Sequence, residues 1–307
     1  MERKFVMSLK VDHISKKFGE NVAVEDVSFE ITKPGVFAFL GTNGAGKSTS
    51  IRMILNMLSK DTGTVTWNGK PLDIIEAKVG YLSEERGLYP KYTIIEQMQY
   101  FAGLKGMDKK QTAAAIDYLF DRLKIDEYRK KKAEQLSKGN QQKVQLAAAL
   151  ICNPELIILD EPLSGLDPVN ADLFKSIIRE ERDKGKYIIM SSHQMEIIEE
   201  FCEDLVLLHK GKTVLQGNLN EIKKSYGRVN LSVKADKPFL PIAEECGLRV
   251  IEDTPNGTEF KVKSEEQAAE FLRKMLDNGI NVIKYDLREP SLHELFVEKC
   301  GGDNNEV

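Results

Sequence analysis

The stretch Gly41–Ser48 constrains the fold of this chain more than any other feature. It reads Gly-Thr-Asn-Gly-Ala-Gly-Lys-Ser and fits the pattern G-x-x-x-x-G-K-[ST] at every required position. A continuous apolar run, Val36–Leu40, precedes it, and an amphipathic helical pattern beginning near Ile51 follows it. A strand, a glycine-rich loop and a helix in this order are the context in which the pattern forms a phosphate-binding P-loop. Without that context the stretch would be an ordinary glycine-rich turn.

The residue types in this loop suit a triphosphate. Glycines let successive backbone N–H groups turn toward the phosphates without a Cβ in the way, and the following helix adds the positive end of its dipole. Lys47 is expected to reach the β- and γ-phosphates and to act in catalysis, and the Ser48 hydroxyl is expected to bind Mg²⁺. The residues expected to hold the nucleotide here are Gly41, Thr42, Asn43, Gly44, Ala45, Gly46, Lys47, Ser48 and Thr49.

A second apolar run, Leu156–Leu159, ends in Asp160-Glu161. A buried parallel strand would deliver both acids to its carboxyl end, where α/β sheets bind their ligands. We expect Asp160 to hold Mg²⁺ through water and Glu161 to act as the general base for an attacking water. Alone, such a pair more often marks a strand that ends in solvent.

The remaining pattern indicates an α/β protein with two domains. Strands alternate with helices up to about residue 218, which favours a parallel sheet, and a long helical block runs through Thr93–Ile151. From Arg228 onward the order is β-α-β-β-α-β-α, with a hairpin signal at Asn256-Gly257, which predicts a small α+β ferredoxin-like domain. We place the linker at 218–228.

Composition excludes several classes of protein. The net charge of −4 gives no basic excess, so nucleic acid is not expected as a partner. The four cysteines form no cluster, so no structural metal is expected. No signal-peptide pattern is present, and the longest apolar run, Leu146–Cys152, is far shorter than the ~20 residues that span a bilayer. We therefore expect a cytoplasmic protein.

Further motifs resemble the ATP-binding cassette (ABC) family. Leu136–Gln142 reads Leu-Ser-Lys-Gly-Asn-Gln-Gln, close to the family's L-S-G-G-Q signature at the start of a helix. The loop Ser164–Asp167 follows the acidic strand end, and His193 matches the family's switch histidine, a catalytic residue. Phe18 matches the aromatic residue that stacks on adenine. Taken singly, Phe18 would be a core aromatic, His193 a satisfied histidine and Ser137 a helix N-cap.

The resemblance implies a fold and a set of partners. The fold is a P-loop NTPase cassette over residues 1–220, with a RecA-like parallel-sheet core, an N-terminal antiparallel β subdomain and a helical subdomain at about 90–152. An accessory α+β domain would occupy residues 228–303. ATP and Mg²⁺ would be the cofactors. Two chains would pair head to tail, so that Ser137, Gly139 and Asp167 of one protomer reach the nucleotide held by the other.

The sequence departs from the family pattern at two places. Lys138 and Asn140 replace the usual glycine and glutamine of the signature. The glutamine that the family places after the strand Val79–Leu82, a Mg²⁺ and water ligand, aligns with Glu84, although Glu85 is adjacent. A carboxylate can also bind Mg²⁺.

The segment Tyr81–Pro90 and the run Glu289–Phe296 are similar to one branch of ABC ATPases, the sodium-efflux and drug- or peptide-efflux exporters. That branch implies a separately encoded membrane permease, which would hold the chain peripherally at the inner face of the cell membrane. The alternatives are a soluble ABC ATPase of translation or DNA repair, and a regulatory module that binds ATP without turnover. The single P-loop and the lack of long heptad repeats disfavour the former, and the presence of Glu161 and His193 disfavours the latter.

Overall fold

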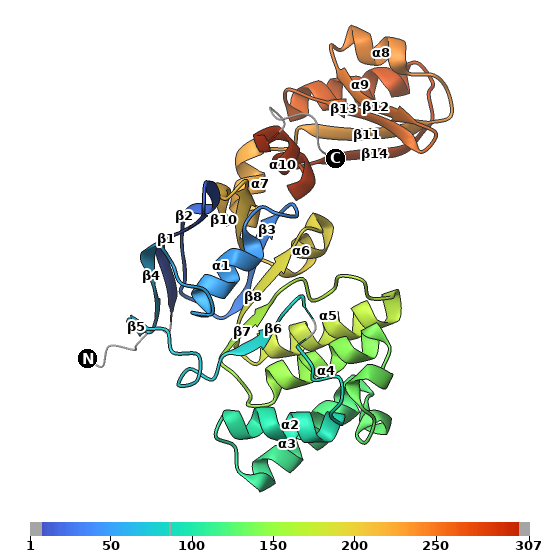
Figure 1. Cartoon of the computed structure of the whole chain (residues 1–307). Helices are drawn as coiled ribbons and strands as arrows, with labels where there is room; N and C mark the ends of the chain where they lie inside the picture. The colour runs from blue at the N-terminus through green and yellow to red at the C-terminus, as the bar shows by residue number, and fades with distance from the viewer. Residues whose placement is uncertain (1–7, 86, 301–307) are drawn as a thin grey trace, which may run out of the picture. The chain divides into compact units, whose positions relative to one another are not determined.

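The structure, a computed structural model, describes residues 8–85 and 87–300. The chain divides into two compact units, Met1–Gln216 and Gly217–Val307. Figure 1 shows the elements of both units along the chain.

The first unit is built on a ten-stranded sheet with the order β5-β4-β1-β2-β10-β9-β3-β8-β7-β6. β1, β2, β4 and β5 pair antiparallel, whereas β3 with β8 and β9, and β7 with β6 and β8, pair parallel. The strands are β1 (Leu9–Phe18), β2 (Asn21–Ile31), β3 (Gly35–Gly41), β4 (Thr62–Trp67), β5 (Lys70–Pro71), β6 (Gly80–Leu82), β7 (Leu156–Leu159), β8 (Tyr187–Ser192), β9 (Asp204–His209) and β10 (Lys212–Asn218).

The helices of the first unit cover this sheet and form a separate helical group. α1 (Lys47–Ile54), α5 (Pro168–Asp183) and α6 (Met195–Phe201) lie along the sheet. α2 (Ile94–Leu104), α3 (Lys109–Leu123) and α4 (Lys138–Leu150) lie together, drawn in green in Figure 1, with short 3₁₀ turns at Asp126–Tyr128 and Ala133–Gln135 between α3 and α4. Capping boxes at Thr93 and Asp108 fix the starts of α2 and α3.

The core of the first unit explains why the strands read as continuous apolar runs. All four residues of β7 and all six of β8 are buried, as expected for parallel strands covered on both faces. Gly80 in β6 lets α4 approach closely, because a Cβ there would lie 2.5 Å from the Ala149 carbonyl oxygen. The sheet therefore places the carboxyl ends of β3, β6, β7 and β8 at one edge.

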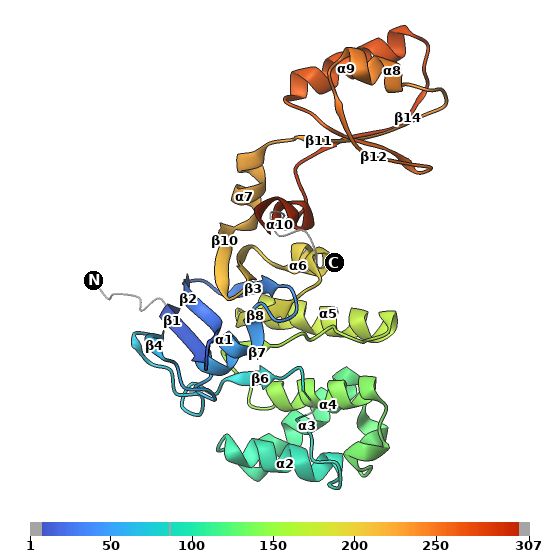
Figure 2. The same ribbon diagram turned by 45° about the horizontal axis from the view of Figure 1, so that its top comes forward.

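The second unit contains a four-stranded antiparallel sheet with the order β12-β13-β11-β14. Its elements are α7 (Leu219–Tyr226), β11 (Asn230–Ala235), α8 (Leu240–Glu245), β12 (Arg249–Thr254), β13 (Gly257–Lys261), α9 (Glu265–Asp277), β14 (Val282–Arg288) and α10 (Leu292–Cys300). Figure 2 shows α8 and α9 on one face of this sheet, where Phe239, Phe260 and Phe271 pack against one another.

The architecture confirms the predicted α/β cassette fold followed by an α+β unit. The βαββαβ order and the strand order of the second unit are those of a ferredoxin-like fold. No helix among residues 8–85 and 87–300 is long and apolar enough to cross a bilayer.

Candidate functional site

The loop between β3 and α1 requires its glycines. Gly41 and Gly46 have φ angles of 154° and 102°. A Cβ on Gly41 would lie 2.6 Å from the Leu208 carbonyl oxygen, and one on Gly46 would lie 2.5 Å from the Ala23 carbonyl oxygen. No side chain caps α1, so its N-terminal N–H groups face the loop. The loop is therefore an anion-binding cradle at a helix N-terminus.

Lys47 and Glu161 meet inside this cradle. The Lys47 ammonium donates to the carbonyl oxygens of Gly41 and Thr42 at 2.8 and 3.2 Å, and lies 3.3 Å from Glu161 Oε1. Both side chains are almost fully buried, at 6% and 5% exposed. Glu161 Oε1 accepts no hydrogen bond from any described residue. A buried carboxylate oxygen with an open lone pair is suited to receive a proton from a bound water.

The backbone at Glu161 is itself unusual. Its φ angle is 51°, which is a costly conformation for a residue with a long side chain. The Ser191 hydroxyl accepts a hydrogen bond from the Glu161 N–H at 2.9 Å and holds this turn. The turn redirects the chain at the end of β7, immediately after Asp160, and this directs the Glu161 side chain back toward Lys47.

Asp160 lies beside two serine hydroxyls. Ser191 Oγ donates to Asp160 Oδ1 at 2.5 Å, and the Ser48 hydroxyl is near enough to lower the pKa of the carboxyl. Burial raises the pKa of the Asp160 carboxyl above its usual range, and the two hydroxyl donors limit the rise. The carboxylate thus lies next to Ser48, the other residue predicted to bind Mg²⁺.

His193 follows β8 and contacts Glu161 from the other side. Its Nδ1 lies 2.9 Å from Glu161 Oε2. In the tautomer that carries the proton on Nδ1, the ring donates to the carboxylate and Nε2 is left as an acceptor. Glu161 therefore lies between Lys47 and His193, with one oxygen facing each.

A pocket of about 750 Å³ brings Phe18 together with most of the predicted P-loop residues, although Gly41, Thr42 and Ala45 do not line it. Phe18, at the end of β1 and half exposed, lies at one side, and the P-loop lies at the other. The lining residues are Phe18, Asn21, Val22, Ala23, Asn43, Gly44, Gly46, Lys47, Ser48, Thr49, Glu84, Glu161 and Lys210.

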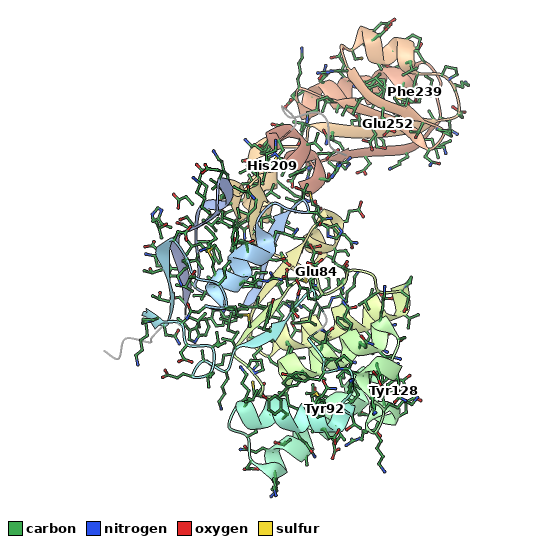
Figure 3. All side chains as sticks on the ribbon, viewed as in Figure 1. Glu84, Tyr92, Tyr128, His209, Phe239 and Glu252 are labelled. Carbon is green, nitrogen blue, oxygen red and sulfur yellow. The ribbon has the colours of Figure 1, made fainter. Side chains whose placement is uncertain are left out.

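The pocket also separates the roles of the two neighbouring acids Glu84 and Glu85. Glu84 lines the pocket, and Figure 3 labels it in the loop that follows β6. The Glu85 carboxylate instead accepts a hydrogen bond from Arg52 of α1 at 2.8 Å. Glu84 is thus the acid available to a ligand.

Ser137, Gly139 and Asp167 do not line this pocket. Ser137 is exposed and caps α4, accepting a hydrogen bond from the Asn140 N–H at 3.3 Å. The Asp167 carboxylate caps α5 in the same way. It accepts a hydrogen bond from the Asn170 N–H, and this bond lowers the pKa of Asp167. A Cβ on Gly139 would lie 3.2 Å from Asn170 Nδ2, so the starts of α4 and α5 are neighbours. The two helix starts therefore lie together, outside the lining of the pocket.

Several residues of the site were not predicted from the sequence. Asn21, Val22 and Ala23 enter the pocket because β2 follows β1 through a tight turn that pairs Phe18 with Asn21. That turn, Gly19-Glu20, was a readable signal. Lys210 enters the pocket from the turn between β9 and β10. Ser191 of β8 supports Asp160 from behind it, and no local sequence pattern places either residue there.

Comparison with known proteins agrees with this geometry. Residues 24–164 match the family described as ABC transporter, and residues 217–300 match the C-terminal domain of the DrrA1-3-like ATP-binding proteins. The chain is 43% identical over 294 residues to the uncharacterized ABC transporter ATP-binding protein YhaQ of Bacillus subtilis, covering 95% of this chain and 98% of that protein. It is 31% identical over 225 residues to the Nod factor export ATP-binding protein I of Rhizobium etli, covering 72% and 71%.

A solved structure described as the ATP-binding subunit of an ABC transporter superposes with a TM-score of 0.65 at 28% identity, covering 71% of this chain and 93% of that one. The P-loop, the buried Asp160-Glu161 pair and these similarities together show that the chain belongs to the ATP-binding subunits of ABC transporters, a family that binds and hydrolyses ATP.

Proposed function

We propose that this chain powers a separately encoded export permease through a head-to-tail dimer that binds and hydrolyses two ATP molecules. The observation that carries the chemistry is the buried Glu161 carboxylate, held between His193 and the Lys47 ammonium, with no hydrogen bond from the described residues to Oε1. Glu161 would take the proton of the attacking water as its oxygen bonds to the γ-phosphorus and the bond to ADP breaks. Lys47 would hold the phosphates, and His193 would fix the orientation of Glu161.

The residues present suit a magnesium ion. The Ser48 hydroxyl, the Asp160 carboxylate and the Glu84 carboxylate are all hard oxygen donors, and Ser48 and Asp160 already contact each other. Bound Mg²⁺ would supply charge neutralisation on the phosphate oxygens. Asp160 would reach it through water, and Glu84 would contribute from the loop after β6.

The dimer proposal is supported by the surface that carries Ser137, Gly139 and Asp167. These residues do not contact the pocket of their own protomer, yet Ser137 presents an exposed helix N-terminus that suits a phosphate. A second copy of the chain would supply this surface to the nucleotide. Phe18 would stack on the adenine of the nucleotide bound in its own pocket.

Export is supported by relatives rather than by the site. The Rhizobium relative is named for Nod factor export, and the C-terminal unit matches the DrrA1-3-like proteins. We place the chain at the inner face of the membrane through that permease.

Turnover by Glu161→Gln tests the chemistry. We expect ATP binding to remain and steady-state hydrolysis to fall at least about 100-fold, as for loss of a general base. Glu181→Gln is the matched control, because Glu181 is similarly buried on α5 but pairs with Lys184 outside the pocket. Unimpaired hydrolysis by Glu161→Gln would remove Glu161 as the base.

Affinity capture from detergent-solubilised native membranes tests the partner, with the Glu161→Gln chain as bait and ATP present. A stoichiometric polytopic membrane protein is the expected result. Recovery of only ribosomal or DNA-repair proteins would leave the ATPase intact and overturn the transport proposal.

A further inference from the structure

Two loops that carry carboxylates into the pocket emerge side by side from the sheet. β6 and β7 pair parallel, with Leu82 opposite Leu159, and the Asp160 N–H donates to the Leu82 carbonyl at 2.8 Å. The loop after β6 therefore begins next to the loop after β7. The first carries Glu84 and the second carries Glu161.

α4 spans both loops with two glutamine side chains. Gln142 Nε2 donates to the Pro162 carbonyl at 2.9 Å, one residue after Glu161. Gln145 Nε2 donates to the Glu85 carbonyl at 3.1 Å, one residue after Glu84. Residues three apart lie on the same face of a helix, so a single face of α4 holds both loops.

The Glu85 residue is held from a second direction as well. Its carbonyl also accepts from Ser83 Oγ at 2.8 Å, and its carboxylate accepts from Arg52 at 2.8 Å. Arg52 belongs to α1, the helix that begins at Lys47. The loop that carries Glu84 is thus tied to the P-loop helix by a side chain and to α4 by its backbone.

We infer that Gln142 and Gln145 are positioning residues that make α4 control the placement of both Glu84 and Glu161 in its own protomer. Ser137 is the N-cap of α4, and Gln145 lies roughly 12 Å farther along the helix at 1.5 Å per residue. A displacement of the exposed end of α4 would move the two tethered loops together. The inference rests on the proposed roles of Glu84 and Glu161.

Gln142→Leu, Gln145→Leu and the double variant test this inference on the full chain. Leucine keeps much of the side-chain volume and removes the donor. We expect kcat to fall about 3- to 10-fold for each single variant, the scale of one neutral hydrogen bond, with the dissociation constant for ATP unchanged. Gln145→Glu, which cannot donate when ionised, should lose as much as Gln145→Leu.

Gln267→Leu is the matched control. Gln267 Nε2 also donates to backbone carbonyls, those of Cys246 and Gly247, but it belongs to the second unit and is not among the residues that line the pocket. Loss of these two hydrogen bonds in Gln267→Leu should leave kcat unchanged. A fall in thermal stability without a fall in kcat for the α4 variants would overturn the inference, because a merely structural bond would behave in that way.

The outcomes separate this inference from the proposed function. If Glu161→Gln abolishes hydrolysis while the two α4 variants turn over like the wild type, the tether inference fails alone. If Glu161→Gln turns over normally, the proposed role of Glu161 as the base fails. The inference that α4 positions Glu161 for catalysis then fails with it, whatever the α4 variants do.

Discussion

Ser191→Ala probes the centre of the site through stability rather than activity. Ser191 is fully buried, donates to Asp160 Oδ1 and accepts from the Glu161 N–H. The substitution removes a hydrogen bond to a charged group and leaves a buried N–H unsatisfied. Each loss costs on the order of 1–3 kcal/mol, and because the two share one hydroxyl we expect a total of about 2–4 kcal/mol.

The chain contains its own probe for this measurement. Trp67 is the one tryptophan in the sequence, lies in the core of the first unit and contacts Tyr187 of β8 edge-on, with ring centroids 5.2 Å apart. Its fluorescence during urea unfolding reports on the first unit without interference from the second. The same strand, β8, carries Ser191.

Ser50→Ala is the control with the opposite expected sign. Ser50 is fully buried on α1, but its hydroxyl has no hydrogen-bond partner among the described residues. Removing an unsatisfied polar group should stabilise the unit, by about 1 kcal/mol. Equal and small effects of Ser191→Ala and Ser50→Ala would refute the assignment of Ser191 as the support of both acids.

The pH dependence sharpens the test. The folded-state pKa of Asp160 is raised, so its ionisation costs stability as the pH rises from its unfolded pKa through the folded one. Ser191 offsets part of that cost only while Asp160 is ionised. The penalty of Ser191→Ala should therefore be largest at neutral pH and should shrink as acid protonates Asp160.

Phe18→Ala should weaken ATP binding by about 5- to 150-fold, the equivalent of 1–3 kcal/mol of stacking, and a fluorescent nucleotide titration with unchanged affinity would contradict its place beside the base. Ser137→Arg should block ATP-driven dimerisation while sparing binding to the monomer, as light scattering would show, and a normal dimer would contradict the head-to-tail arrangement. Glu294→Gln tests the second unit. Burial would raise the pKa of Glu294, but donors on Arg288 and Ser291 outweigh it and hold it at about 2. Because this pKa is depressed, the ionised Glu294 carboxylate stabilises the second unit above its unfolded pKa, and that stabilisation is lost as the pH falls toward 2. Acid should therefore speed hydrogen exchange in α10 of the wild type but change that of Glu294→Gln little.

Residues within short, regular segments were predictable because local spacing encodes them. The P-loop glycines and the Asp160-Glu161 pair each follow directly after an apolar run that predicts a buried strand. Each pattern is contiguous in the sequence, so it can be read without knowing the fold. The start of α4 at Ser137 was likewise readable as an N-cap. The structure confirms these local features.

Residues brought in by sheet pairing were not predictable in the same way. Ser191 reaches Asp160 only because β8 lies beside β7, and Lys210 enters the pocket only because the turn before β10 lies against Ala23. Gln142 and Gln145 read as ordinary polar positions of a helix. A single sequence does not state which strands are neighbours, and these contacts depend on that order.

The strand order of the first unit also has a consequence for biosynthesis. β10, which begins at Lys212, lies between β2 and β9 and pairs with β2 through Asp26. The antiparallel strands made first can therefore join the parallel strands only when Lys212 has left the ribosome. Until then β2 presents an open edge to any other nascent chain. The P-loop is among the earliest parts synthesised, yet its pocket closes only with the last strands of the unit.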